Sequence, residues 1–208
     1  MDSGQKPAVI AIQGNSDKYD AYKTLMVKYK KAYQQGFYFE SLWILYAMLE
    51  DRTSAFLYYI GFVTEDRRKV VGAKGIQQSI RGILKLSDKA IFDFSTLYGK
   101  TLAIKKAVIW SRDAAASDDY QKEIKTCLNR KAINSPEFMQ CLDGIDFWRD
   151  KRNGLTHALF SVQGYETAKE LQPLAEQGYL LARGLDNAVG AFRKRSVKYN
   201  VRDMFGLK

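Results

Sequence analysis

Histidine, cysteine and proline are scarce in this chain of 208 residues, which contains one, two and three of them respectively. Two cysteines, Cys127 and Cys141, are too few for a disulfide framework, and with one histidine they make a poor metal-binding set. We therefore expect two buried, unpaired thiols, and neither a metal nor another cofactor.

Long apolar segments are missing as well. No run approaches the roughly 20 apolar residues that span a bilayer. The apolar stretch at residues 8–12 is too short for the core of a signal peptide. The sequence thus predicts a cytoplasmic protein without a membrane partner.

Positive charge, in contrast, is plentiful. The chain has 33 Lys and Arg against 23 Asp and Glu, a formal net charge of +10 at pH 7. This excess favours a polyanionic partner, nucleic acid ahead of an anionic membrane surface, although solubility alone is an alternative explanation. Because 46% of the residues are hydrophobic, one core can be buried. We expect a flexible lead-in over residues 1–15 and a single domain over residues 16–208.

Apolar residues recur at helical spacing along most of the chain, and no segment alternates convincingly as a strand. The segment from residue 37 to 61 is apolar around much of its circumference, which predicts a central, largely buried helix. Cap residues and glycines set the expected ends of the others. The predicted helices cover residues 16–35, 37–61, 76–86, 88–98, 100–112, 118–132, 136 into the segment around His157, and 164–199. The fold class is all-α.

The single histidine, His157, lies in a segment rich in charged and apolar residues, five positions after Arg152. On an ideal helix Asn153 and His157 lie about 40° apart, whereas Arg152 and His157 are separated by about 140°. Arg152 has a long side chain whose planar fork suits phosphate oxygens, and Gly154 can loosen the turn between the two. Asn153 is a candidate for holding the imidazole in one orientation.

The run Arg152-Asn153-Gly154-Leu155-Thr156-His157 resembles the Arg, polar residue, His signature of HEPN domains, all-helical modules that include many metal-independent endoribonucleases. The long helix carrying Glu50-Asp51-Arg52 adds to the resemblance, which covers most of the chain. The resemblance implies a HEPN-like bundle with additional helices, since those between about residues 100 and 134 lie outside the four-helix core. One branch of toxins has a Tyr two positions after the His, where this chain has Leu159, so modification by the nucleotidyltransferase antitoxins of that branch is not expected.

The resemblance also implies a reaction, in which an RNA 2′-hydroxyl attacks the adjacent phosphate without a metal. His157 would transfer protons, Arg152 would neutralise the phosphate and Asn153 would orient the imidazole. Because one histidine cannot be both acid and base, the implied site is shared in a homodimer. A toxin or defence effector, with an antitoxin or regulatory protein as partner, fits this activity. Weaker RNA-backbone contacts are assigned to Arg67, Arg68, Lys69, Arg193, Lys194 and Arg195.

Other interpretations of the same residues remain open. A histidine followed by apolar residues is often hydrogen-bonded at a core edge, and an arginine near a helix end is often a cap. The chain would then be a non-catalytic HEPN-like module that binds nucleotide, nucleic acid or a protein partner. Trp43, Trp110 and Trp148 can in principle stack on bases, but their spacing follows apolar helix faces and predicts mostly core positions.

Overall fold

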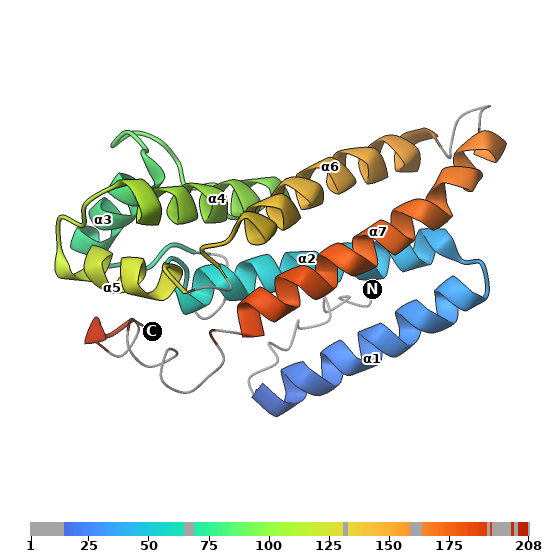
Figure 1. Cartoon of the computed structure of the whole chain (residues 1–208), viewed down its shortest axis with the longest axis horizontal. Helices are drawn as coiled ribbons and strands as arrows, with labels where there is room; N and C mark the ends of the chain where they lie inside the picture. The colour runs from blue at the N-terminus through green and yellow to red at the C-terminus, as the bar shows by residue number, and fades with distance from the viewer. Residues whose placement is uncertain are drawn as a thin grey trace, which may run out of the picture.

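The computed structural model describes residues 15–64, 69–130, 133–158, 164–190, 192, 201 and 204–207, and these form an all-α fold, as predicted (Figure 1). Apart from one isolated antiparallel bridge between Val63 and Val70, the described residues contain no β-structure. The lead-in expected at residues 1–15 lies outside the described residues except for its last one. The helices are α1 (Asn15–Gln34), α2 (Tyr38–Tyr59), α3 (Lys74–Leu84), α4 (Leu97–Asp113), α5 (Asp119–Leu128), α6 (Pro136–Ala158) and α7 (Gly164–Gly190).

Helix α2 is the centre of the bundle, as its apolar sequence predicted. It packs against α1, α4 and α7, while α6 packs against α4 and α7, and α3 and α5 lie together beside α4 (Figure 1). Leu42, Leu45, Leu49 and Phe56 on α2 are all buried. The helix lies between two left-handed glycines, Gly36 and Gly61, with φ of 77° and 79°. This conformation is strained for residues with a Cβ, so glycine allows the sharp chain reversals at both ends.

The helix expected over residues 88–98 is wrong, because that segment is irregular and α4 begins only at Leu97. Ser87 and Asp88 had the composition of a helix cap, but the cap that forms is Thr96, whose side chain accepts a hydrogen bond from the Gly99 amide. Asp93 holds the preceding turn by accepting hydrogen bonds from Ser95 and Thr96. Side-chain bonds of this kind compete with the helical backbone pattern.

Helix α6 runs without interruption through Gly154 to Ala158. Its start agrees with the sequence pattern, because the Ser135 hydroxyl accepts a hydrogen bond from the Phe138 amide and Pro136 occupies the first position. Helix α7 continues through Pro173 and ends at Gly190. The remainder of the helix predicted to reach residue 199 falls mostly outside the described residues.

Glycines on α6 and α7 let the two helices interlock. A Cβ added at Gly178 would lie 2.6 Å from Nε1 of Trp148, which is fully buried and donates a hydrogen bond to the Leu174 carbonyl at 2.8 Å. The Trp148 indole therefore occupies the space that a side chain at position 178 would need. The same fit recurs where Leu181 covers Gly144 and Cys141 covers Gly184.

Candidate functional site

Arg152 of α6 is directed toward α2 and is buried, with 8% of its surface exposed. Its Cζ lies 4.3 Å from the ring centroid of Trp43 and 4.6 Å from that of Tyr46. These two residues are three positions apart on α2, so they present neighbouring rings to the guanidinium. Asn153 accepts a hydrogen bond from Nη1 of Arg152 at 3.0 Å. The site thus combines a cation, two aromatic rings and one amide.

The guanidinium has more donors than partners. Among the described residues, Nε and Nη2 of Arg152 are buried without a hydrogen-bond acceptor. A buried unpaired donor costs roughly 1–3 kcal/mol. Burial lowers the pKa of Arg152, an effect that the nearby Tyr46 opposes, but an arginine stays protonated at neutral pH. The unpaired donors of Arg152 can therefore bind an anion.

Tyr46 is held in place by a hydrogen bond to a charged pair. Its hydroxyl donates a hydrogen bond to Glu50 at 3.3 Å, and Glu50 pairs with the buried Lys100 of α4. Burial and then the Glu50 carboxylate raise the pKa of the Tyr46 hydroxyl. Glu50 therefore helps to position the Tyr46 ring that the Arg152 guanidinium contacts.

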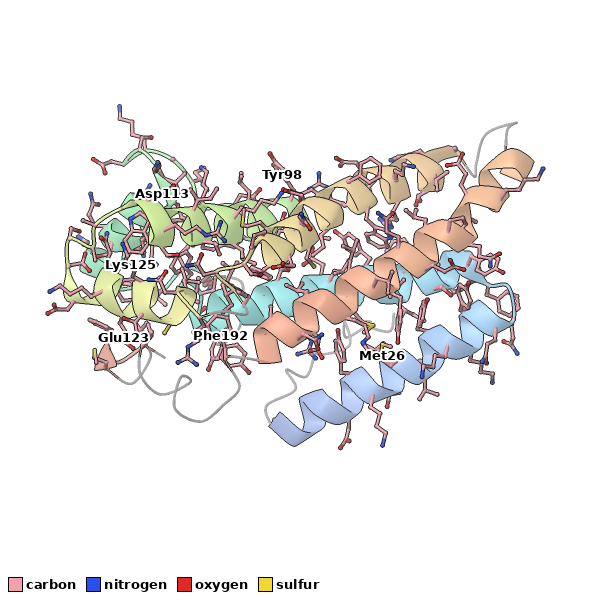
Figure 2. The ribbon with its side chains drawn as sticks, in the orientation of Figure 1. Met26, Tyr98, Asp113, Glu123, Lys125 and Phe192 are labelled. Carbon is pink, nitrogen blue, oxygen red and sulfur yellow. The ribbon has the colours of Figure 1, made fainter. Side chains whose placement is uncertain are left out.

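A second group of charges links α6 to the start of α4. Asp146 accepts hydrogen bonds from Thr101 at 2.6 Å and from Lys105 at 2.7 Å. Arg149, one turn before Arg152, lies 3.4 Å from Asp146 and places its Cζ 4.6 Å from the centroid of Tyr98. Figure 2 shows Tyr98 where α4 and α6 lie side by side. This network holds the α6 segment that carries Arg152 at a fixed distance from α4.

His157 is exposed in the last turn of α6. Because α6 is unbroken, His157 and Arg152 remain about 140° apart around the helix within one chain. No side-chain hydrogen bond joins His157 to another described residue. The Asn153 side chain is hydrogen-bonded to Arg152. Its expected role in orienting His157 stays a prediction. The structure brings Arg152 and Asn153 together and leaves the imidazole facing outward.

The weaker RNA-contact predictions lie mainly outside the described residues, which include neither Arg67 and Arg68 nor the residues from Arg193 to Arg195. Lys69 is described and exposed. These assignments stay predictions.

The three tryptophans differ in a way that their spacing did not reveal. Trp148 and Trp110 are core residues, with 0% and 5% of their surface exposed, as predicted. Trp43 is half exposed, at 50%, although it follows the apolar pattern of α2. Phe39, one turn earlier, meets its ring edge-on at a centroid distance of 6.3 Å. Sequence periodicity cannot separate a core ring from one that covers a buried cation at the surface.

The two cysteines are not activated nucleophiles. Both cysteines are free, and burial raises the pKa of the Cys127 and Cys141 thiols to about 11, which suppresses the nucleophilic thiolate at neutral pH. Within the described part of the chain, no group of three or more His, Cys, Asp or Glu side chains can hold a metal ion. None of the described helices is both long and apolar enough to cross a bilayer.

Comparison of the chain with protein-family models, with curated proteins and with solved structures found no match. The sequence motif and the surroundings of Arg152 are therefore the features that point to a function.

Proposed function

We propose that the protein is a metal-independent endoribonuclease of the HEPN type whose active site is completed by a second copy of the chain. The observation that carries the proposal is the guanidinium of Arg152, which is more than nine-tenths buried and has two nitrogens, Nε and Nη2, without a hydrogen-bond partner among the described residues. Phosphate oxygens satisfy a planar guanidinium in a bidentate manner. The nearby His157 is exposed and accessible to another molecule.

The reaction is attack of an RNA 2′-oxygen on the adjacent phosphorus, with cleavage of the bond from phosphorus to the 5′-oxygen. One His157 takes the proton of the 2′-hydroxyl, and His157 of the second copy donates a proton to the leaving 5′-oxygen. The Arg152 donors stabilise the added negative charge on the pentacoordinate phosphate. The products are a 2′,3′-cyclic phosphate and a free 5′-hydroxyl.

A non-catalytic nucleic-acid-binding module is the second candidate. It is favoured by the unbroken α6, which keeps His157 on a different side of the helix from Arg152 in one chain. In such a module Arg152 would bind phosphate and His157 would have no chemical role. Replacing His157 separates the two candidates, because only the ribonuclease needs the imidazole.

The test follows cleavage of a fluorogenic single-stranded RNA in excess EDTA. We expect the His157→Ala variant to lose at least about 100-fold in rate, the usual contribution of general acid–base catalysis. Lys151→Ala is the matched control, since Lys151 is an exposed cation on the same helix. Equal cleavage by wild type and His157→Ala, or no cleavage of a varied RNA set by wild type, would refute the catalytic proposal.

The dimer is tested separately. Wild-type specific activity should rise with protein concentration through the range in which analytical ultracentrifugation detects a monomer–dimer equilibrium. Mixing His157→Ala with Arg152→Ala should yield heterodimers that do not regain full activity, because their shared site then has only one imidazole. Activity independent of concentration in a protein that stays monomeric would contradict the shared site.

A further inference from the structure

Trp43 covers one side of the Arg152 guanidinium, with 4.3 Å between its ring centroid and Cζ. Nε and Nη2 of the guanidinium are shielded from solvent, so an anion reaches them only after a neighbouring side chain moves. Tyr46 donates a hydrogen bond to Glu50, which is in turn paired with Lys100. Trp43 has no such hydrogen bond among the described residues, and half of its surface is exposed. Of the two rings near the guanidinium, the indole is therefore the less restrained.

The exposed part of the Trp43 ring is also suited to a planar ligand. The guanidinium lies over the ring, at 4.3 Å from its centroid, and Phe39 borders the ring edge-on. A nucleobase stacks on an aromatic face of this kind irrespective of its sequence. In a duplex, each base is already stacked and paired, so its faces are not available. An unpaired nucleotide alone offers both a base for Trp43 and a phosphate for Arg152.

We propose that Trp43 is a base-stacking residue, and that the nucleic acid recognised at Arg152 is therefore single-stranded, with an unpaired base on the indole and its phosphate on the guanidinium. The inference rests on the proposed function for the identity of the substrate as RNA. It adds the strandedness of that substrate and a positioning residue, Trp43, that lies outside the Arg-Asn-His motif.

The experiment uses a single-stranded, fully 2′-O-methylated octanucleotide, which lacks the 2′-hydroxyl nucleophile and so binds without being cleaved. Because Trp110 and Trp148 are buried, quenching of intrinsic fluorescence by the oligonucleotide reports mainly on Trp43. We expect saturable quenching in wild type and its loss in Trp43→Phe. Fluorescence anisotropy of a labelled oligonucleotide then measures affinity in every variant.

Stacking of one base predicts that Trp43→Leu weakens binding by roughly 5- to 150-fold, whereas Trp43→Phe, which keeps an aromatic face, stays within a few-fold of wild type. The matched control is Phe147→Leu, which removes another half-exposed ring that lies near a cation, Lys151, but on a different side of α6 from Arg152. This control should bind as wild type does. Circular dichroism verifies that each variant is folded.

An abasic oligonucleotide completes the test. It should bind wild type more weakly than the intact strand but should bind Trp43→Leu no more weakly than the intact strand does, since the stacking interaction is already absent. Absence of binding, binding without quenching, equal binding and quenching by a duplex, or unchanged affinity in Trp43→Leu would each overturn the inference. Quenching in a protein that cleaves nothing would refute catalysis and leave this inference standing, and cleavage without quenching would do the reverse.

Discussion

Replacing Arg152 by Met should abolish function while leaving the stability of the protein close to that of wild type. The substitution removes two unpaired buried donors, a gain of roughly 1–3 kcal/mol each. It loses the contacts of the cation with Trp43 and Tyr46, worth about 1–2 kcal/mol, and a charge-assisted hydrogen bond to Asn153, about 1.5–3 kcal/mol. Met keeps the length and apolar contact of the side chain. At the middle of each range the gain and the losses nearly cancel, so the unfolding free energy should change by less than about 1 kcal/mol.

Arg52→Met is the matched comparison, because Arg52 is an equally buried arginine over an aromatic ring, Tyr22, at 3.7 Å. Nε of Arg52 lies 3.1 Å from Asp186 on α7, at angles outside those of a hydrogen bond, so the substitution removes an ion pair without removing a hydrogen bond from Nε. Breaking this partly exposed pair should cost about 1–3 kcal/mol, less than the cost for a fully buried one.

Urea unfolding followed by circular dichroism measures both variants. The prediction is a loss of stability in Arg52→Met and a change of less than about 1 kcal/mol in Arg152→Met, together with loss of RNA binding or cleavage in Arg152→Met alone. If Arg152→Met lost more than about 1 kcal/mol, the unpaired donors would not be an energetic burden and the reasoning for an anion site at Arg152 would fail.

Two further predictions concern the stability of the bundle. Gly178→Ala should destabilise it by about 1–3 kcal/mol in urea unfolding, because the new Cβ overlaps the Trp148 indole. Gly154→Ala, with open space around the new Cβ, should stabilise it by about 0.5–1 kcal/mol. Equal effects of the two substitutions would refute the proposed packing at Gly178. Burial raises the pKa of Tyr29 to about 12, so the neutral Tyr29 hydroxyl should add roughly 2 kcal/mol to the unfolding free energy below pH 10, and this contribution should disappear between pH 10 and 12. Tyr29→Phe should flatten the dependence of stability on pH in this range, and an unchanged dependence would contradict the prediction.

The sequence predicted the helical class and most helix positions, because apolar periodicity and caps are local signals. It failed over residues 88–98, where the side chain of Asp93 forms a competing turn and the effective cap is Thr96 instead of Ser87 or Asp88. That outcome depends on contacts which propensity does not contain. The α6 boundary was easier, since Ser135 and Pro136 together specify one start.

At the candidate site, the sequence identified Arg152 and His157 by type and spacing but could not place them. The burial of Arg152 follows from its position on the core side of α6, and its unpaired donors follow from the absence of a hydrogen-bond acceptor within reach among the described residues. Both are tertiary properties. The exposure of Trp43 was missed for the same reason, because an apolar helix pattern does not show which of its residues a neighbouring helix covers.

The glycine contacts between α6 and α7 restrict how the molecule can move. Sliding one helix along the other by a turn, about 5.4 Å, would remove Trp148 and Leu181 from the spaces at Gly178 and Gly144 that now accommodate them. Helices α6 and α7 should therefore move together as one rigid unit. Movements of side chains around Arg152, which need only a change of rotamer, should then be faster than any rearrangement of these two helices.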